Sequence, residues 1–355
     1  MKDTIYGLTF DQLGTWLEEH GEKKSRTKHI WHALYRERVT EFSQMEQLNE
    51  KCQALLAEHF TIATMSEHTR QQSQDGTVKF LFQLYDGNLI ETVLMRHKFG
   101  LSVCVTTQVG CNIGCSFCAS GLIAKSRDLT SGEIVEQIMN VQHFLDAEGE
   151  GGKVSHIVVM GIGEPFDNFT HMSNFIRVVK DHNGLAIGPR HITVSTSGLA
   201  AKFKEFTDSD LGVNLAISLH APNNELRSRI MKINKAIPLE KLMPAIDYYL
   251  ENSNRRATIE YILLKDVNDL PEHAQELSEL MQPRKDMVNV NLIPYNPVDE
   301  HSQYQRSTQE AIRTFYDILK KNNISASVRL EHGTDIDAAC GQLRSKQLNK
   351  QSNCS

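Results

Sequence analysis

Three cysteines, Cys111, Cys115 and Cys118, lie within eight residues of one another, and their spacing suits a metal centre. Glycines before and between them let the backbone close tightly around converging thiolates. A structural zinc site needs four ligands, and the next histidine along the chain is the distant His143. A cube-shaped iron–sulfur cluster held by three thiolates keeps one iron open for a small ligand. The pattern therefore predicts a cluster that takes part in chemistry.

Two further thiols and one carboxylate could take part, although each also has an ordinary structural interpretation. Cys104 lies in an apolar stretch, where a lone cysteine is most often a small buried hydrophobe, as we also expect for Cys52. Cys340 lies among small residues near the C-terminus, and such a loop can carry a thiol into a cavity. Glu91 interrupts an otherwise apolar or β-branched run, so it is either a solvent-facing residue or a placed base.

The order of helical and β-rich segments predicts an α/β fold built around the cysteine loop. Residues 1–60 have helical periodicity, and residues 61–97 contain a β-hairpin around an Asp-Gly turn. From 98 to 344, strands alternate with helices, which is typical of a parallel sheet closing into a full or partial barrel. A polar tail follows at 345–355. Six strands are predicted at 102–106, 156–160, 191–195, 214–218, 258–263 and 288–293.

Helix starts and strand ends add detail to this arrangement. Thr130 with Glu133, and Ser307 with Glu310, have the spacing of capping boxes. The cysteine loop follows the first barrel strand, which places it at the carboxyl ends of the strands, where barrels carry their active sites.

A glycine-rich turn and several small polar residues follow later strands at the same face. The turn at 160–165 lacks the third glycine of a dinucleotide fingerprint, because residue 166 is phenylalanine. Its carboxylate, Glu164, suits a positively charged amine, and a simple tight turn is the alternative. Polar groups at 195–198, 218–221 and 294–297 could hydrogen-bond a ribose, a carboxylate and a base.

Composition limits the classes of partner. The chain has 355 residues, 40% of them hydrophobic, with no early apolar segment and no apolar run long enough for a membrane span, so we expect a cytoplasmic protein. Its seven cysteines do not suggest a secreted disulfide framework. A net charge of -6 disfavours nucleic acid overall, so RNA binding would rest on local basic stretches at 21–40 and 341–355, which could equally be solvated faces.

The Cys-x3-Cys-x2-Cys motif after a barrel strand is the signature of the radical S-adenosylmethionine (SAM) enzymes. With the segments 89–93, 104–111, 161–165, 218–221 and 335–343, the chain closely resembles the bacterial dual-specificity RNA adenine-C2 methyltransferases. The resemblance covers about 5 to 345. It implies a partial (β/α)6 radical SAM barrel with a small N-terminal helical domain and a linking β-hairpin.

The resemblance also implies a role for each candidate residue. Cys111, Cys115 and Cys118 would hold one [4Fe–4S] cluster whose open iron binds exchangeable SAM. The positions matching the family's SAM contacts are Gly163, Glu164, Ser195, Ser218, Leu219, His220 and Asn296.

Two SAM would be consumed per methylation. One would methylate the Cys340 sulfur, and reductive cleavage of the second would yield a 5′-deoxyadenosyl radical that activates this methyl group for addition to adenine C2. Glu91 matches the proton acceptor, and Cys104 would release the RNA by forming a transient disulfide with Cys340.

The implied substrates are adenine 2503 of 23S rRNA and adenine 37 of certain tRNAs, with an electron donor such as flavodoxin. Residues 21–40 would contact RNA phosphates, although Trp31 and Tyr35 within them could equally be core residues. The alternative is C8 methylation of the same rRNA adenine. A non-catalytic iron–sulfur protein is a second alternative, and the remote thiol of Cys340 argues against it.

Overall fold

The computed structural model describes residues 2–333, 335–336 and 342–344. Its centre is a ten-stranded sheet with the strand order β14-β13-β12-β11-β10-β9-β6-β5-β4-β3. From β14 to β6 all neighbours pair in parallel, and from β6 to β3 they pair antiparallel. The parallel strands are β6 (Gly100–Cys104), β9 (Val154–Val159), β10 (Ile192–Thr196), β11 (Asn214–Ser218), β12 (Ala257–Leu263), β13 (Val288–Pro294) and β14 (Ala326–Val328).

The six predicted barrel strands are confirmed, and they lie side by side in chain order from β6 to β13. The chain adds β14, which has only three residues and too little sequence for a pattern to be read. The predicted hairpin is also confirmed, with β4 (Val78–Leu84) and β5 (Leu89–His97) joined at Gly87, whose φ is 80°. The polar strand β3 (Met65–Gln72) completes an antiparallel extension of the barrel sheet.

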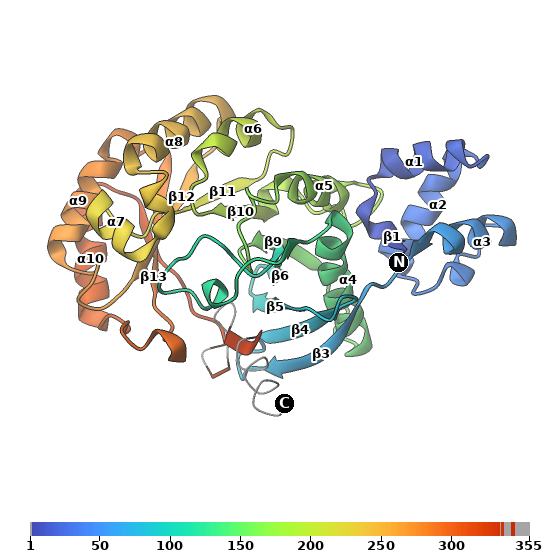
Figure 1. Cartoon of the computed structure of the whole chain (residues 1–355), viewed down its shortest axis with the longest axis horizontal. Helices are drawn as coiled ribbons and strands as arrows, with labels where there is room; N and C mark the ends of the chain where they lie inside the picture. Colours follow the sequence, from blue (N-terminus) through green and yellow to red (C-terminus); the bar gives the residue numbers. More distant parts are fainter. Residues whose placement is uncertain (1, 334, 337–341, 345–355) are drawn as a thin grey trace.

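Helices cover the outer face of the curved sheet (Figure 1). They are α4 (Ser131–Ala147), α5 (Phe169–Lys180), α6 (Phe203–Asp208), α7 (Asn224–Ile230), α8 (Leu239–Ser253), α9 (Pro271–Met281) and α10 (Gln309–Lys321). Burial alternates along β13, where one set of side chains packs beneath the helices and Asn289, Asn291 and Ile293 point the other way, into the barrel interior. Among the described residues, no helix is both long and apolar enough to cross a membrane.

One of the two predicted capping boxes is correct. The Thr130 hydroxyl accepts from the Glu133 N–H, and the Glu133 carboxylate accepts from the Thr130 N–H. The other was wrong by one residue, because Thr308 caps α10 and Ser307 instead donates its hydroxyl to Asp269 at 2.6 Å. Ser307 and Thr308 both carry a hydroxyl group that could cap the helix. The buried carboxylate of Asp269 binds the Ser307 hydroxyl, which leaves Thr308 as the cap.

The N-terminal lobe contains α1 (Phe10–Glu19), α2 (Thr27–His32) and α3 (Glu50–His59), and it packs beside α4 and α5 (Figure 1). Trp31 and Tyr35 are buried, which confirms their interpretation as core residues. Their cluster is continuous with the core under the barrel helices. The two lobes therefore share one hydrophobic interior.

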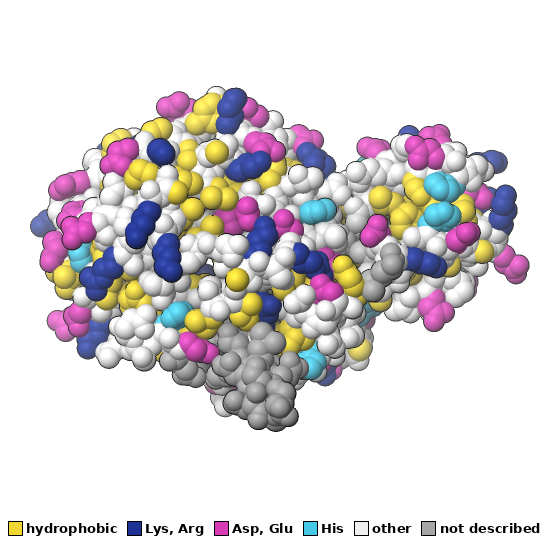
Figure 2. All heavy atoms as spheres, viewed as in Figure 1, with side chains coloured by type: hydrophobic (Ala, Val, Ile, Leu, Met, Phe, Trp, Pro, Cys, Tyr) yellow, Lys and Arg dark blue, Asp and Glu magenta, His cyan; other side chains and the backbone are white. Residues whose placement is uncertain are grey.

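The basic stretch at 21–40 is partly neutralised in the folded lobe. Lys24 pairs with Glu18 at 3.9 Å, Arg26 pairs with Glu22 at 2.8 Å, and Arg38 pairs with Asp146 of α4. Figure 2 shows acidic and basic side chains mixed on the visible face of this lobe. The local positive charge available to an RNA is therefore smaller than the sequence alone suggests.

Candidate cluster and cofactor site

The cysteine loop is fixed at the mouth of the barrel by backbone hydrogen bonds. The Cys111 N–H donates to the carbonyl of Ile123 at 3.0 Å, and the Ser116 N–H donates to the carbonyl of Ile230, the last residue of α7, at 2.9 Å. Cys115 forms an antiparallel bridge with Met231. The loop therefore rests on the end of α7, and its three thiols face the inside of the barrel.

Gly110 is required by the close approach of this loop to the chain at 123–124. Its φ is 86°, and a Cβ at this position would overlap the carbonyl oxygen of Ala124. Gly149 has a similar φ of 69° but no atom within 4 Å of an added Cβ, so it is a matched control for backbone strain without overlap. We expect Gly110→Ala to lower the free energy of unfolding by about 1–3 kcal/mol more than Gly149→Ala does. Chemical denaturation of both variants measures the difference, and equal losses would contradict it.

A cavity of about 260 Å³ lies beside the cysteine loop. It brings together most of the residues predicted for the cluster and for SAM, namely Cys111, Cys115, Cys118, Gly163, Glu164, Ser195, Ser218 and His220. We call it the cluster cavity. Leu219 is fully buried behind its wall, where its N–H donates to the Glu260 carbonyl at 3.1 Å. Asn296 lines a neighbouring cavity instead.

The three thiols fit an iron–sulfur cluster by their chemistry and surroundings. Burial, together with the proximity of Cys118, raises the pKa of Cys111 to about 11 and raises that of Cys115 strongly. Positive charge from iron would be needed to hold such thiols as thiolates. Within the described part of the chain, no group of three His, Cys, Asp or Glu side chains is placed to hold a single metal ion. The cysteines form one wall of a cavity with room for a larger group.

The carboxylate of Glu164 ties the glycine-rich turn to the end of β10. One oxygen accepts from the Thr196 hydroxyl at 2.7 Å and the Phe166 N–H at 2.9 Å. The other accepts from the N–H and the hydroxyl of Ser197, at 2.7 and 2.6 Å. Burial raises the pKa of Glu164, and these hydrogen bonds oppose that rise. Because four donors already bind this carboxylate, Glu164 holds the glycine-rich turn against the end of β10, in addition to the predicted contact with an amine.

His220 presents a neutral ring to the cluster cavity. Its Nδ1 accepts from the Ile262 N–H at 3.1 Å, which leaves the ring proton on Nε2. Burial and the nearby Arg227 lower the pKa of His220 to about 3. The backbone of His220 has a φ of 60°, and its ring meets Phe117 edge-on at 5.2 Å between centroids. His220 therefore offers an uncharged donor at the cavity wall.

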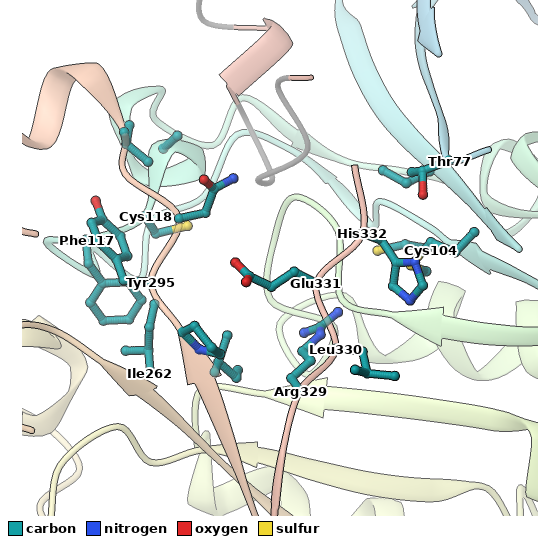
Figure 3. A pocket seen from close by; sticks show the side chains of 17 residues that line it. Thr77, Cys104, Phe117, Cys118, Ile262, Tyr295, Arg329, Leu330, Glu331 and His332 are labelled. Atoms are coloured by element: carbon teal, nitrogen blue, oxygen red, sulfur yellow. The ribbon is translucent and has the colours of Figure 1, made fainter. Parts of the chain in front are cut away.

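A second cavity, of about 270 Å³, adjoins the first and contains Cys104 (Figure 3). Val93 and Met95 of β5 pack together with Cys104, and Asn296 also lines this cavity. Figure 3 shows Phe117 and Cys118 on one side, Cys104 on the other, and the segment 329–332 between them. The two cavities share the residues Phe117, Cys118, Ile262, Ile293 and Arg329. Cys104 is buried, as predicted, and it also faces this second cavity.

Glu91 lies on β5, on the same face of the strand as Val93, but outside the lining of both cavities. Its carboxylate is buried, forms an ion pair with Lys79 at 3.0 Å and accepts from the Arg344 N–H at 2.8 Å. The alternative of a solvent-facing residue was therefore wrong, because Lys79 of the neighbouring strand β4 pairs with this carboxylate and residues 342–344 pack against this part of β5.

Cys340 lies outside the described residues, but the chain on both sides of it is held near the second cavity. Before it, Asp75 in the β3–β4 turn accepts from the Gly333 N–H at 2.9 Å, and Asp335 accepts from the Gln74 N–H at 3.0 Å. After it, Gln342 donates to the carbonyl of Pro297 at 2.7 Å. His332 itself lines the second cavity.

Sequence reasoning passed over Arg227, which joins several parts of the site. Its fully buried guanidinium donates to the carbonyls of Ser197 at 2.7 Å and Leu219 at 3.2 Å, and to the Asn234 side chain at 2.9 Å. Burial lowers the pKa of Arg227 to about 10, and the nearby Cys115 opposes this. An arginine on a short helix carries no sequence signal of its own, because most are exposed.

The sequence and the fold of this chain were compared with those of known protein families and solved structures, and the matches fit the site described above. Residues 105–281 match the model of the Radical SAM superfamily, and residues 4–62 match the ribosomal RNA large subunit methyltransferase N-terminal domain. A crystal structure of a radical SAM methyltransferase from Sphaerobacter thermophilus superposes with a TM-score of 0.90 at 38% identity, covering 96% of this chain and 98% of that one. The fold and the site together are those of a radical SAM methyltransferase.

The sequence relatives narrow this class. Proteins named probable dual-specificity RNA methyltransferase RlmN from Exiguobacterium sibiricum and Shouchella clausii are each 68% identical over 98% of this chain and 98% of their own length. One of the same name from Enterococcus faecalis is 61% identical over 99% of this chain. The chain belongs to the RlmN family of radical SAM RNA methyltransferases, whose cofactors are an iron–sulfur cluster and SAM.

Proposed function

We propose that this protein methylates C2 of adenine 2503 in 23S rRNA and of adenine 37 in certain tRNAs, in the cytoplasm, by way of an S-methyl group on Cys340. The observation that carries the proposal is the pair of adjoining cavities. One is lined by the three cluster cysteines and the other by Cys104, and Cys118 belongs to both. A radical made at the first can thus act on a methyl group presented at the second.

The cluster, held by Cys111, Cys115 and Cys118, would supply the electron that cleaves SAM, with flavodoxin or a similar protein as donor. Cys340 would accept a methyl group from one SAM, and a second SAM would be consumed in activating it. The tethers at Gly333, Asp335 and Gln342 support the delivery of this thiol to the second cavity.

Glu91 and Cys104 would complete the reaction. The ion pair with Lys79 and the hydrogen bond from the Arg344 N–H hold the Glu91 carboxylate in place, and we propose that this carboxylate accepts the C2 proton. The Cys104 thiolate would then attack the Cys340 sulfur, so that a sulfur–sulfur bond forms while the bond between sulfur and the new carbon breaks. The electron pair of the broken bond would stay on that carbon, which takes up a proton to become the methyl group of the released RNA, and the two sulfurs would be left oxidised as a disulfide. Strands β5 and β6 are paired so that Val93 lies opposite Cys104. Glu91, two residues before Val93, is therefore held at a fixed position relative to Cys104 within one sheet.

Mass spectrometry tests this proposal directly. After anaerobic incubation with SAM alone, we expect one added methyl group on the peptide that contains Cys340. After incubation with RNA, digestion is expected to yield 2-methyladenosine. An unmethylated Cys340 peptide would contradict the mechanism, and 8-methyladenosine in the digest would move the assignment to C8 methylation.

A further inference from the structure

Glu260 is a buried carboxylate in the barrel interior that none of the roles above uses. It lies on β12, where the sheet register places it beside Ser218 of β11 and Asn291 of β13. Its side chain is only 5% exposed, and it lines the cluster cavity together with Ser195 and Ser218. Glu260 thus extends the row of polar groups across neighbouring strands and adds a carboxylate to its hydroxyl groups.

One oxygen of Glu260 is held from behind by a chain of side chains on β13 and β14. Asn291 donates its amide to Oε2 of Glu260 at 2.8 Å and accepts from the Ser327 hydroxyl at 3.3 Å. Asn289 donates to Ser327 at 3.1 Å and accepts from Ser325 at 2.9 Å. This chain fixes the orientation of the Asn291 amide, and through it the orientation of the carboxylate.

The other oxygen, Oε1, receives no hydrogen bond from any residue that the structure describes. Burial raises the pKa of Glu260, and the nearby Arg329 opposes that rise. This oxygen is not sealed off within the protein, and it reaches the space of the cluster cavity. A carboxylate oxygen in such an enclosed place is costly to leave without a donor. The cavity ligand should therefore supply a donor at this position.

SAM, the cofactor of the family, carries suitable donors in its two ribose hydroxyls. Ser195 and Ser218 can either donate or accept, whereas an ionised carboxylate only accepts, so it selects for a hydroxyl. Carboxylates serve the same purpose toward ribose in dinucleotide sites. We propose that Glu260 accepts a hydrogen bond from the ribose of bound SAM and that the Asn291 chain pre-positions it. The proposal rests on SAM binding and not on Cys340 or on the position methylated.

The experiment measures the affinity of the anaerobically reconstituted protein for SAM and for its 2′-deoxy and 3′-deoxyribose analogues, without RNA. Glu260→Gln keeps the shape of the side chain and an acceptor for Asn291, and Glu260→Ala removes both. Glu272→Gln on α9 removes the same charge at an exposed position and is the matched control. Iron content and thermal unfolding establish that each variant carries its cluster and is folded.

We expect Glu260→Gln to weaken SAM binding about tenfold, with a larger loss for Glu260→Ala and no change for Glu272→Gln. At least one deoxyribose analogue should bind the wild type and Glu260→Gln with nearly equal affinity, because the group that Glu260 recognises is missing from it. The proposal is overturned if both Glu260 variants bind SAM as the wild type does, or if they weaken SAM and both analogues equally. Repeating the titration in a Cys340→Ala background separates this outcome from any failure of the methylation mechanism.

Discussion

Cys340→Ala is expected to reduce RNA methylation to the level of a control without enzyme, while the cluster is retained. The proposed mechanism has no other methyl acceptor, so losing this sulfur stops the reaction before RNA is attacked. The neighbouring chain is anchored by side chains and backbone at Asp75, Gln74 and Pro297, none of which depends on the thiol. The variant should therefore keep its fold and its iron.

Three measurements on this variant are needed together: methylated adenosine after RNA digestion, iron content, and the mass of the C-terminal peptide. Cys52→Ala is the matched control, because it removes a buried thiol from α3, in the N-terminal lobe. That control should methylate RNA normally apart from a modest loss of stability. RNA methylation by Cys340→Ala at the wild-type rate would exclude the S-methylcysteine route.

Loss of one cluster thiol is expected to reduce RNA methylation as much as Cys340→Ala does, but by removing the cluster and not the methyl carrier. In Cys118→Ala, two thiolates remain, which are too few to hold a cluster with one open iron. We expect most of the iron and its visible absorbance to be lost, and cleavage of SAM to 5′-deoxyadenosine to fall to background. Methylation of Cys340 and of RNA should also cease, because SAM would lose the open iron that binds it.

The comparison of the two variants separates making the radical from carrying the methyl group. Reductive SAM cleavage should survive in Cys340→Ala and be absent from Cys118→Ala. A Cys118→Ala protein with full iron content would show that this residue is not a ligand. The backbone of residue 118 should be unaffected, because its N–H donates to the Cys115 carbonyl in either variant.

The barrel was predictable because its signals are local. Each strand from β6 to β13 is a short run of β-branched and apolar residues. The capping box at Thr130 likewise predicts the start of α4 to within a few residues. The short β14 and the polar β3 carry no comparable signal, since their pairing partners are chosen by the sheet around them. The cap at Thr308 depends on Asp269, which is far away in the sequence.

The candidate site was predictable in its residues more than in their roles. Glu91 and Glu260 both interrupt apolar strands, and sequence reasoning singled out one and passed over the other although the pattern is the same. Glu91 pairs with a lysine, whereas Glu260 lines a cavity. These different surroundings come from the neighbouring strands and cannot be predicted from either segment alone. Arg227 and the four donors around Glu164 are likewise products of the assembled fold.

The common core of the two lobes has a consequence for RNA choice. Gly132 of α4 approaches the N-terminal segment so closely that a Cβ would overlap Thr4, and Asn174 of α5 donates to the carbonyl of Gly7 at 2.8 Å. These contacts fix the position of the N-terminal lobe relative to the mouth of the barrel. Under the proposed function, an RNA that contacts both the lobe and the barrel mouth would place its adenine at the distance between them. Two RNAs of unrelated sequence would then be accepted when their folded shapes share that distance.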